Sequence, residues 1–286
     1  MVLPNNNPTL SGGSPHGTTE IATFIECPQK HGYKYSAKLT PLFRRRADDG
    51  RDTGTLIHVG LAHFYGAQIT PPPDWIQDPF YAVTAVAQEK GWIHLLRDAL
   101  TTLHLYIEVR TKKPQFTKIV AVEDPCQVYL TDRNGKQHIV TTRLDLVAHY
   151  KGNLVEANHK TSVRMSYARP GIDAAARLQF LLEAVLARSK YPNLKYVMVN
   201  PIQTSRNPDG ARISDPEIID LSPLAFSRLG CDIAFWKEKI AEVEARFPDP
   251  LNRPRTYLCK SRFGLCDFFP LCSTGLATLQ YYTQDR

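Results

Sequence analysis

Two neighbouring strand-like segments constrain the fold of this chain more than any other feature of the sequence. The first reads RLDLVAHY, the second reads LVEANHKTS, and a Gly-Asn turn joins them. Successive side chains of a strand point to opposite faces, so Glu156, Asn158 and Lys160, which lie two residues apart, share one face. Asp145 lies between apolar residues of the first segment. The hairpin therefore predicts a sheet in which an acid on one strand lies near a polar row on the next.

Further periodic segments around this hairpin predict the rest of the architecture. Apolar residues recur at helical spacing in some segments and alternate with polar residues in others. The fold class that we expect is α/β (α+β), with helices flanking a central mixed β-sheet. Pro28 is expected to bend or restart the first helix. The expected helices cover residues 18–35, 53–65, 78–110, 173–188 and 223–247, and the expected strands cover residues 118–123, 127–130, 137–150, 154–161, 194–200 and 213–221.

Length and charge narrow the class of protein. The 286 residues suit a flexible tail, 1–17, followed by one domain, 18–286, with a helical insertion at about 74–113. The net charge of +7 favours a polyanionic partner such as nucleic acid. No signal peptide and no apolar run long enough for a membrane helix is visible, which predicts a cytoplasmic protein without a membrane partner.

The acid on one strand and the polar row on its neighbour indicate metal-dependent hydrolysis. An Asp next to an acid-x-Lys strand is the arrangement by which a nuclease gathers divalent cations against a scissile phosphate. Carboxylates hold Mg²⁺ or Mn²⁺, and the lysine orients or activates the attacking water. We therefore predict that Asp145 and position 158 bind metal and that Lys160 assists the water. A strand-edge acid and a surface lysine are the competing interpretation of this pair.

In this pattern the chain resembles the PD-(D/E)XK nuclease superfamily, specifically its RecB-like branch with CRISPR-adaptation exonucleases and many phage exonucleases. Four further features match that branch. GTLIH ends at His58, VEDP contains Glu123, RLQFLLEA contains Gln179, and Cys27 together with the C-terminal cysteines matches a cluster site. The resemblance spans about residue 19 to residue 272, and the order and spacing of the motifs make it fairly specific.

The resemblance implies a restriction-endonuclease-like core with a helical N-terminal part and a C-terminal cluster-binding tail. It implies that His58 and the backbone carbonyl of His159 are metal ligands, that Glu123 is a candidate ligand for a second metal, and that Gln179 belongs to the catalytic set. The implied activity is that of a Mg²⁺- or Mn²⁺-dependent deoxyribonuclease, in particular an exonuclease of phage or bacterial DNA recombination, repair or processing. The implied partners are single- or double-stranded DNA with free ends and recombination or CRISPR-adaptation proteins, in a bacterial cell or phage-infected host.

One departure from the family pattern bears directly on activity. The family has Asp or Glu two residues before the lysine, and this chain has Asn158. An amide oxygen can contact a cation but brings no charge, so we expect weaker metal binding. Three interpretations compete: a deliberate Asp-to-Asn substitution, a naturally inactive DNA-binding or adaptor protein of the same fold, or replacement of the missing acid by Glu156. We favour the first, because the rest of the predicted site is intact. Two milder departures are Leu182 at the expected Tyr position and Thr142 at a position that is often Gly.

The cysteines predict a second metal centre. Six cysteines in a reducing compartment suggest a metal or cluster site before disulfides. By the resemblance, four of them hold a 4Fe-4S cluster that joins the N-terminal helix to the C-terminal tail. Zinc is the competing chemistry, in a structural protein without DNA contact, but the Cys-x2-Cys pair common in zinc sites is absent. The four are Cys27, Cys259, Cys266 and Cys272.

Candidate DNA contacts are basic residues and one aromatic residue. Arginines neutralise phosphates, and a tyrosine can stack on a base of a single strand. For any one of them, a solvated positive face is an equally good explanation. The candidates are Arg44, Arg45, Arg46, Arg143, Arg164, Tyr167 and Arg169.

Overall fold

The computed structural model describes residues 17–42, 46–132, 134–162, 174–205, 211–220, 223–256, 260–261 and 264–284. The chain forms two compact units. The first unit contains residues 48–126 and 143–225, and the second contains residues 13–47, 127–142 and 226–286. The division falls within two long strands, β2 and β3, so a sequence-based boundary search has no loop or linker to detect there.

A six-stranded mixed sheet forms the centre of the fold, which confirms the predicted fold class. Its order is β2-β3-β4-β5-β6, and β7 also pairs with β5. β4 and β5 are parallel, whereas β3 pairs with β4, and β6 and β7 pair with β5, in antiparallel fashion. The strands are β2 (Lys118–Thr131), β3 (Gln137–Tyr150), β4 (Asn153–Ser162), β5 (Tyr196–Gln203), β6 (Arg212–Ile213) and β7 (Glu217–Asp220).

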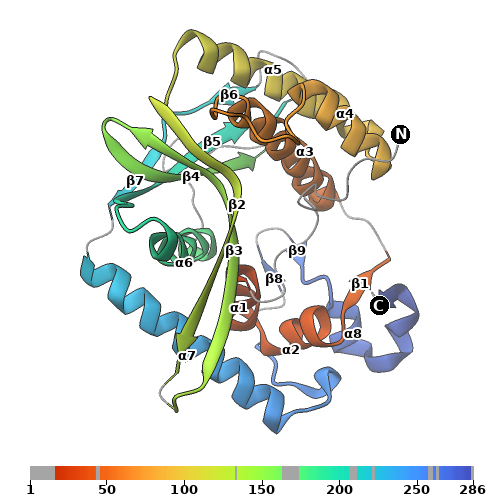
Figure 1. Cartoon of the computed structure of the whole chain (residues 1–286). Coiled ribbons are helices and arrows are strands. Elements are labelled where there is room, and N and C mark those ends of the chain that lie inside the picture. The colour runs from red at the N-terminus through yellow and green to blue at the C-terminus, as the bar shows by residue number, and fades with distance from the viewer. Residues whose placement is uncertain are drawn as a thin grey trace. The chain divides into compact units, whose positions relative to one another are not determined.

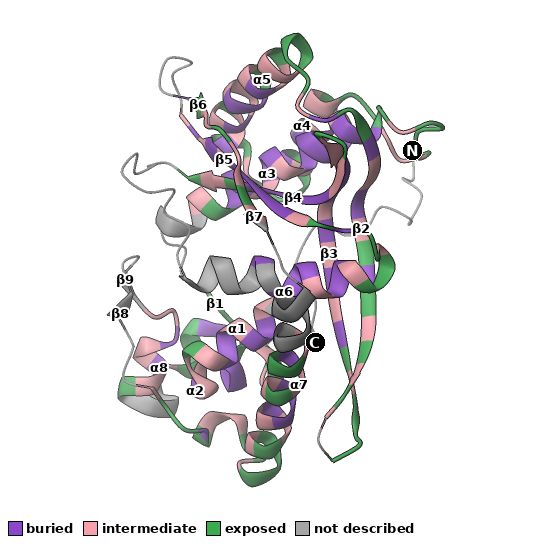
Figure 2. Cartoon of the chain, turned by 90° about the vertical axis from the view of Figure 1, so that its left-hand side faces the viewer, coloured by how far each residue is buried: buried purple, intermediate pink, exposed green. Residues whose placement is uncertain are grey.

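Helices cover both faces of the sheet in the first unit (Figure 1). α3 (Arg46–Gly66), α4 (Pro79–Glu89) and α5 (Leu96–Lys112) pack on one face, and α6 (Ala174–Lys190) lies on the other. Leu146, Ala157 and Met198 of the sheet belong to the same buried cluster as Leu56 and Leu103 of the helices. Figure 2 shows this burial along β4 and β5 and on the facing helices.

Local sequence signals explain where several elements begin and end. Asp78 Oδ1 accepts from the backbone N–H groups of Phe80 and Tyr81, which caps α4 at its N-terminus. The β3–β4 hairpin turns at Lys151 and Gly152, both with positive φ (48° and 79°), as a two-residue turn of this kind requires.

The structure corrects several predicted boundaries. The expected helix 78–110 is two helices, α4 and α5, because the Trp92 N–H donates to the Ala87 carbonyl and ends the first of them. The expected strands 118–123 and 127–130 are one strand, β2. The expected helix 53–65 begins earlier, because α3 starts at Arg46. Pro28 restarts the first helix as predicted, since α1 (Thr18–Glu26) ends before extended Cys27 and α2 (Pro28–His31) follows.

The second unit joins the two ends of the described chain. β1 pairs with β10, with Leu39 opposite Gln284. A small apolar cluster contains Tyr33, Phe268 and Tyr282. Besides α1 and α2, the elements are η1 (Gly32–Ser36), β1 (Leu39–Pro41), α7 (Pro223–Arg246), η4 (Pro250–Asn252), β8 (Lys260–Ser261), β9 (Gly264–Leu265), α8 (Phe269–Thr274), η5 (Gly275–Tyr281) and β10 (Tyr282–Gln284).

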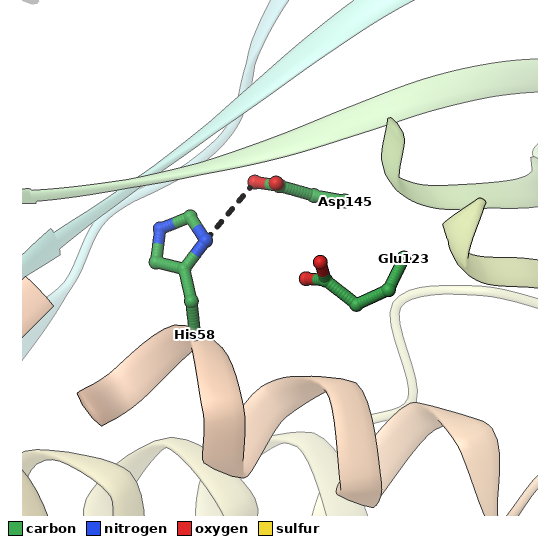
Figure 3. Close-up of side chains that lie close together, drawn as sticks. All are labelled: His58, Glu123 and Asp145. Atoms are coloured by element: carbon green, nitrogen blue, oxygen red, sulfur yellow. Dashed lines mark ion pairs between the residues drawn. The ribbon is translucent and has the colours of Figure 1, made fainter. Parts of the chain in front are cut away.

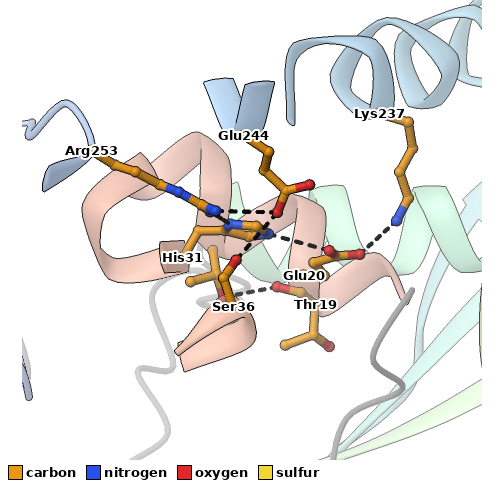
Figure 4. Close-up of polar contacts among 8 residues, drawn as sticks. Thr19, Glu20, His31, Ser36, Lys237, Glu244 and Arg253 are labelled. Carbon is orange, nitrogen blue, oxygen red and sulfur yellow. Dashed lines mark hydrogen bonds and ion pairs between the residues drawn. The ribbon is translucent and has the colours of Figure 1, made fainter. Parts of the chain in front are cut away.

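A buried polar network also links these segments (Figure 4). Glu20 contacts His31 Nε2 at 3.2 Å and Lys237 Nζ at 2.5 Å. Arg253 Nη1 lies 3.0 Å from His31 Nδ1. Because a guanidinium can only donate, His31 Nδ1 must accept from Arg253, and its Nε2–H donates to Glu20. Among the described residues, no helix is both long and apolar enough to cross a membrane.

Candidate metal centre

Three side chains from separate elements converge in the first unit. His58 comes from α3, Glu123 from β2 and Asp145 from β3. Each offers one ligand atom, and these atoms all lie within 4.8 Å of one another (Figure 3). His58 Nδ1 lies 3.3 Å from Asp145 Oδ2. One imidazole and two carboxylates are thus gathered at one point.

His58 reaches this point because α3 packs closely against the end of β4. Gly54 lies about one turn before His58, and a Cβ atom there would stand only 2.4 Å from Oγ1 of Thr161 on β4. Glycine permits this close approach of helix and strand. A larger residue at position 54 would push the helix away and move His58 from Asp145.

Asp145 is oriented at the point where the ladder between β3 and β4 ends. The paired residues run from Tyr150↔Asn153 to Leu146↔Ala157. Beyond that last pair, Asp145 Oδ2 accepts a hydrogen bond of 3.1 Å from the His159 backbone N–H. The carboxylate therefore satisfies a backbone donor near the end of the ladder, which fixes its orientation.

Glu123 has an unusual backbone conformation. Its φ is 47° inside β2, a left-handed conformation that costs a residue with a side chain roughly 1–2 kcal/mol. The side chain is 4% exposed, and its Oε2 lies 2.7 Å from Arg143 Nε. Strain of this kind persists only where the surroundings fix it, and it clusters at functional sites.

The His58–Asp145 pair is favoured in its charged form. Burial alone would raise the pKa of Asp145, but the charge and hydrogen bond of His58, with a smaller effect of His159, outweigh it and lower the pKa to about 2. Burial alone would lower the pKa of His58, and Asp145 outweighs that effect, so the pKa of His58 is raised. The pair therefore behaves as an ion pair.

Glu123 differs from Asp145 because its burial is not outweighed. Burial, and then the charge of Asp145, raise the pKa of Glu123 to about 7, although Arg143 and His58 act in the opposite direction. This carboxyl group therefore exchanges its proton near neutral pH. A cation bound there would have to displace that proton.

The donor set fits a divalent cation. Mg²⁺ and Mn²⁺ prefer carboxylate oxygens and accept an imidazole nitrogen. Ligands about 2.1 Å from one ion lie up to about 4.2 Å apart, so atoms within 4.8 Å of one another need only small shifts to share it. The side chains of His58 and Asp145 are 28% and 22% exposed, which leaves the centre accessible from solvent.

The polar row of β4 faces α6. Asn158 Nδ2 donates to Glu156 Oε1 at 3.3 Å. Glu156 is fully buried, and its Oε2 has no hydrogen-bond partner among the described residues. Burial, and then the charge of Glu183 on α6, raise the pKa of Glu156 well above its ordinary value. Lys160 is exposed, with Nζ 5.9 Å from the ring centroid of Phe180 on α6.

The opposite face of β4 carries His159, whose ring lies among aromatic side chains. Tyr106 Oη lies 3.1 Å from His159 Nε2, and the ring centroids of Tyr65 and His159 are 5.7 Å apart. Burial lowers the pKa of His159 to about 3, so the ring is neutral at physiological pH.

Part of the predicted site set lies outside the described residues. Arg143 is described, and it pairs with Glu123. Arg46 lies on α3, but the placement of its side chain is not described; the same holds for the side chain of Gln179 on α6. The predicted residues that fall outside the description altogether are Arg44, Arg45, Arg164, Tyr167, Arg169 and Cys259.

Three of the four predicted cluster cysteines are described, all half-buried. Cys272 Sγ lies 3.7 Å from Tyr33 Oη. Burial raises the pKa of Tyr33, and the thiols of Cys272 and Cys27 act in the same direction. Burial also raises the pKa of Cys266, with a smaller contribution from Cys272. These thiols thus lie in one electrostatic neighbourhood of the second unit.

Sequence reasoning missed the groups that support the ligands. Arg143, a predicted DNA contact, also pairs with Glu123, a contact that the sequence did not indicate. Tyr106 gave no signal, because a tyrosine at helical spacing is an ordinary core residue. Its contact with His159 joins positions 53 residues apart, which no local pattern reports.

Comparisons with known proteins assign the chain to a family. The family model described as the PD-(D/E)XK nuclease superfamily matches residues 18–272. A crystal structure named "Putative exonuclease" from Eubacterium rectale has a TM-score of 0.54 at 8% identity and covers 91% of each chain, a likeness of fold alone. The crystal structure of the protein SSO0001 has a TM-score of 0.38 at 17% identity over 77% of this chain and 84% of the other. No curated protein matches.

Proposed function

Because the chain belongs to the PD-(D/E)XK nuclease superfamily, we propose that it is a deoxyribonuclease that depends on Mg²⁺ or Mn²⁺, of the exonuclease type found in the RecB-like branch. One observation carries the proposal: the ligand atoms of His58, Glu123 and Asp145 lie within 4.8 Å of one another on this fold. A buried structural cluster would not need partly exposed ligands, and two of these three are accessible from solvent.

Each residue then has a chemical task. His58, Glu123 and Asp145 would hold the cation, and the His159 backbone carbonyl and the Asn158 amide oxygen are further candidate ligands. The cation, when bound, stabilises charge that develops on the phosphate oxygens. Lys160 would orient the attacking water, for which its exposed ammonium is suited. Gln179 is a further proposed catalytic residue.

Asn158 favours a second candidate function, a DNA-binding or adaptor protein that does not cut. The structure weighs against rescue by Glu156, since that carboxyl is fully buried, has a raised pKa and is not among the converging ligands. Two interpretations of Asn158 therefore remain: an introduced substitution and a naturally inactive member of the family.

The test compares the chain with Asn158→Asp on end-labelled single- and double-stranded DNA, with and without Mg²⁺ or Mn²⁺. If the chain is an enzyme impaired at position 158, the aspartate adds a charged ligand, and cation-dependent cleavage should rise at least about 100-fold. The matched control is the double variant Asn158→Asp/Asp145→Asn, which should be inactive. DNA binding without cleavage by Asn158→Asp would instead support the adaptor function.

The proposed setting is phage or bacterial DNA recombination, repair or processing in the cytoplasm of a cell or infected host. DNA ends would be the substrate, and recombination or CRISPR-adaptation proteins are proposed partners. The net charge of +7 supports a polyanionic substrate. Arg44, Arg45, Arg46, Arg143, Arg164, Tyr167 and Arg169 stay the proposed DNA contacts.

We also propose a 4Fe-4S cluster on Cys27, Cys259, Cys266 and Cys272. The donor chemistry fits, since these are thiols and the three described ones lie near Tyr33 or one another. Anaerobic purification should give a brown protein with about four iron and four sulfide per chain. Cys272→Ser should remove the colour, and a colourless protein that holds one zinc would establish the zinc alternative.

A further inference from the structure

A chain of buried contacts links α5 to the candidate ligands. Tyr65 Oη lies 2.7 Å from Tyr106 Oη, and Tyr106 Oη lies 3.1 Å from His159 Nε2. The His159 backbone N–H donates to Asp145 Oδ2 at 3.1 Å. Tyr65 and Tyr106 are 4% and 0% exposed, so water does not compete for these hydroxyls.

These contacts form a closed ring, because α3 carries both Tyr65 and His58. Tyr65 and His58 both belong to α3 and lie seven residues apart, which places them on one face two turns from each other. The rings of His58 and His159 meet edge to face, with centroids 6.2 Å apart. His159 therefore touches His58 with its ring and Asp145 with its backbone, while Tyr106 holds the far side of the same ring.

Tyr106 belongs to α5, within the segment that the sequence marked only as a helical insertion. Among the described residues, His159 Nε2 has no other hydrogen-bond partner. Without the Tyr106 hydroxyl, that buried ring nitrogen would be unpaired, which is unfavourable and favours a different ring orientation. A shifted ring would carry the His159 backbone, and with it the hydrogen bond to Asp145.

From this geometry we infer that Tyr106 is a positioning residue of the metal centre, acting through His159 to hold Asp145 and His58 at the spacing that a divalent cation requires. The inference rests on the proposed function, because it assigns a partner to its ligands. It also gives α5 a task at the site, beyond covering one face of the sheet.

Tyr106→Phe tests it, because the substitution removes one oxygen and keeps the buried ring. Mn²⁺ affinity is measured by titration calorimetry in the parent chain and in Asn158→Asp, alongside the melting temperature of the metal-free protein. Loss of an outer partner typically weakens metal binding 10- to 100-fold, so we expect about a tenfold rise in the dissociation constant. The matched control is Tyr65→Phe, which keeps the Tyr106–His159 contact and should change the affinity less than about threefold.

A double-mutant cycle separates positioning from packing. If Tyr106 acts through His159, the effects of Tyr106→Phe and His159→Phe on Mn²⁺ affinity will not add, and the double variant will resemble His159→Phe alone. Additive effects, or a fall in melting temperature with unchanged affinity, would overturn the inference and leave Tyr106 a core residue. Failure of both parent chains to bind Mn²⁺ would overturn the proposed function itself.

Discussion

The two units each gather one histidine and two acidic side chains, but they arrange them differently. In the second unit, anions and cations alternate along a row of contacts in which His31 links Glu20 to Arg253: Lys237, Glu20, His31, Arg253 and Glu244 follow one another (Figure 4). In the first unit, the ligand atoms of His58, Glu123 and Asp145 turn toward one point (Figure 3). The residue types in the two clusters are similar, but the pattern of contacts between them differs.

This difference in arrangement separates structural from functional use. Alternation neutralises each charge within the protein, and the side chains of Glu20, His31, Lys237 and Arg253 are at most 8% exposed. Convergence brings two carboxylates close together, and burial of Glu123, followed by the charge of Asp145, raises the pKa of Glu123 to about 7. A cluster of the first kind stabilises the fold, and one of the second kind is suited to bind a cation from solution.

The largest expected effect breaks the alternating cluster. Glu20→Gln would leave Lys237, whose side chain is 7% exposed, without its counter-charge. Removing one partner of a buried pair costs about 3–5 kcal/mol, so denaturant unfolding should show a loss of that size. Glu244→Gln is the control, since that carboxylate is 44% exposed and its loss should cost less than about 1 kcal/mol. Equal losses in the two variants would contradict the comparison.

The next effect breaks the converging cluster. Asp145→Asn removes the charge that His58 and the His159 N–H both contact. Mn²⁺ affinity should fall by more than about 100-fold, because a direct ligand contributes more than an outer partner. The free energy of unfolding should change far less than in Glu20→Gln. Unaltered Mn²⁺ binding measured by calorimetry would remove Asp145 from the ligand set.

A pH series sharpens the contrast. Metal binding needs the Glu123 carboxylate, whose pKa of about 7 keeps it largely protonated at lower pH. Affinity for Mn²⁺ should therefore rise about tenfold from pH 6 to pH 8, as one proton ceases to compete. The raised pKa of His58 acts in the same direction. Glu123→Gln should bind more weakly with a flatter profile, and an unchanged slope in that variant would assign the proton elsewhere.

The smallest effect concerns Glu156, next to the converging cluster. Its folded-state pKa is raised well above the unfolded value, so the stability it contributes as a neutral group is fully present below about pH 4.5 and is lost as pH rises. Glu156→Gln keeps the shape without the charge. It should raise the free energy of unfolding by about 1 kcal/mol at pH 8 and by less at pH 5. Destabilisation at pH 8 in thermal melts would indicate that the charged form is used.

The comparison also explains which parts of the structure were predictable. Alternation over residues 137–161 led to the central hairpin and to Asp145, and the resemblance of GTLIH and VEDP to family motifs led to His58 and Glu123 as candidates. The positions of helix ends were less predictable, since the break after α4 depends on a capping bond. The boundary between the two compact units crosses two strands, so no local pattern marks it.

The sequence by itself determined the mixed α/β fold and Asp145 as a candidate ligand, and the resemblance of its motifs to a family added His58 and Glu123, because strand alternation and motifs are local properties of the chain. Only the tertiary structure decided that Glu123 joins His58 and Asp145, that Arg143 serves Glu123, and that Glu156 is buried toward α6. It alone placed Tyr106 behind His159. The physical reason is that these contacts join residues tens of positions apart, and burial and charge at such a contact depend on every element that packs around it.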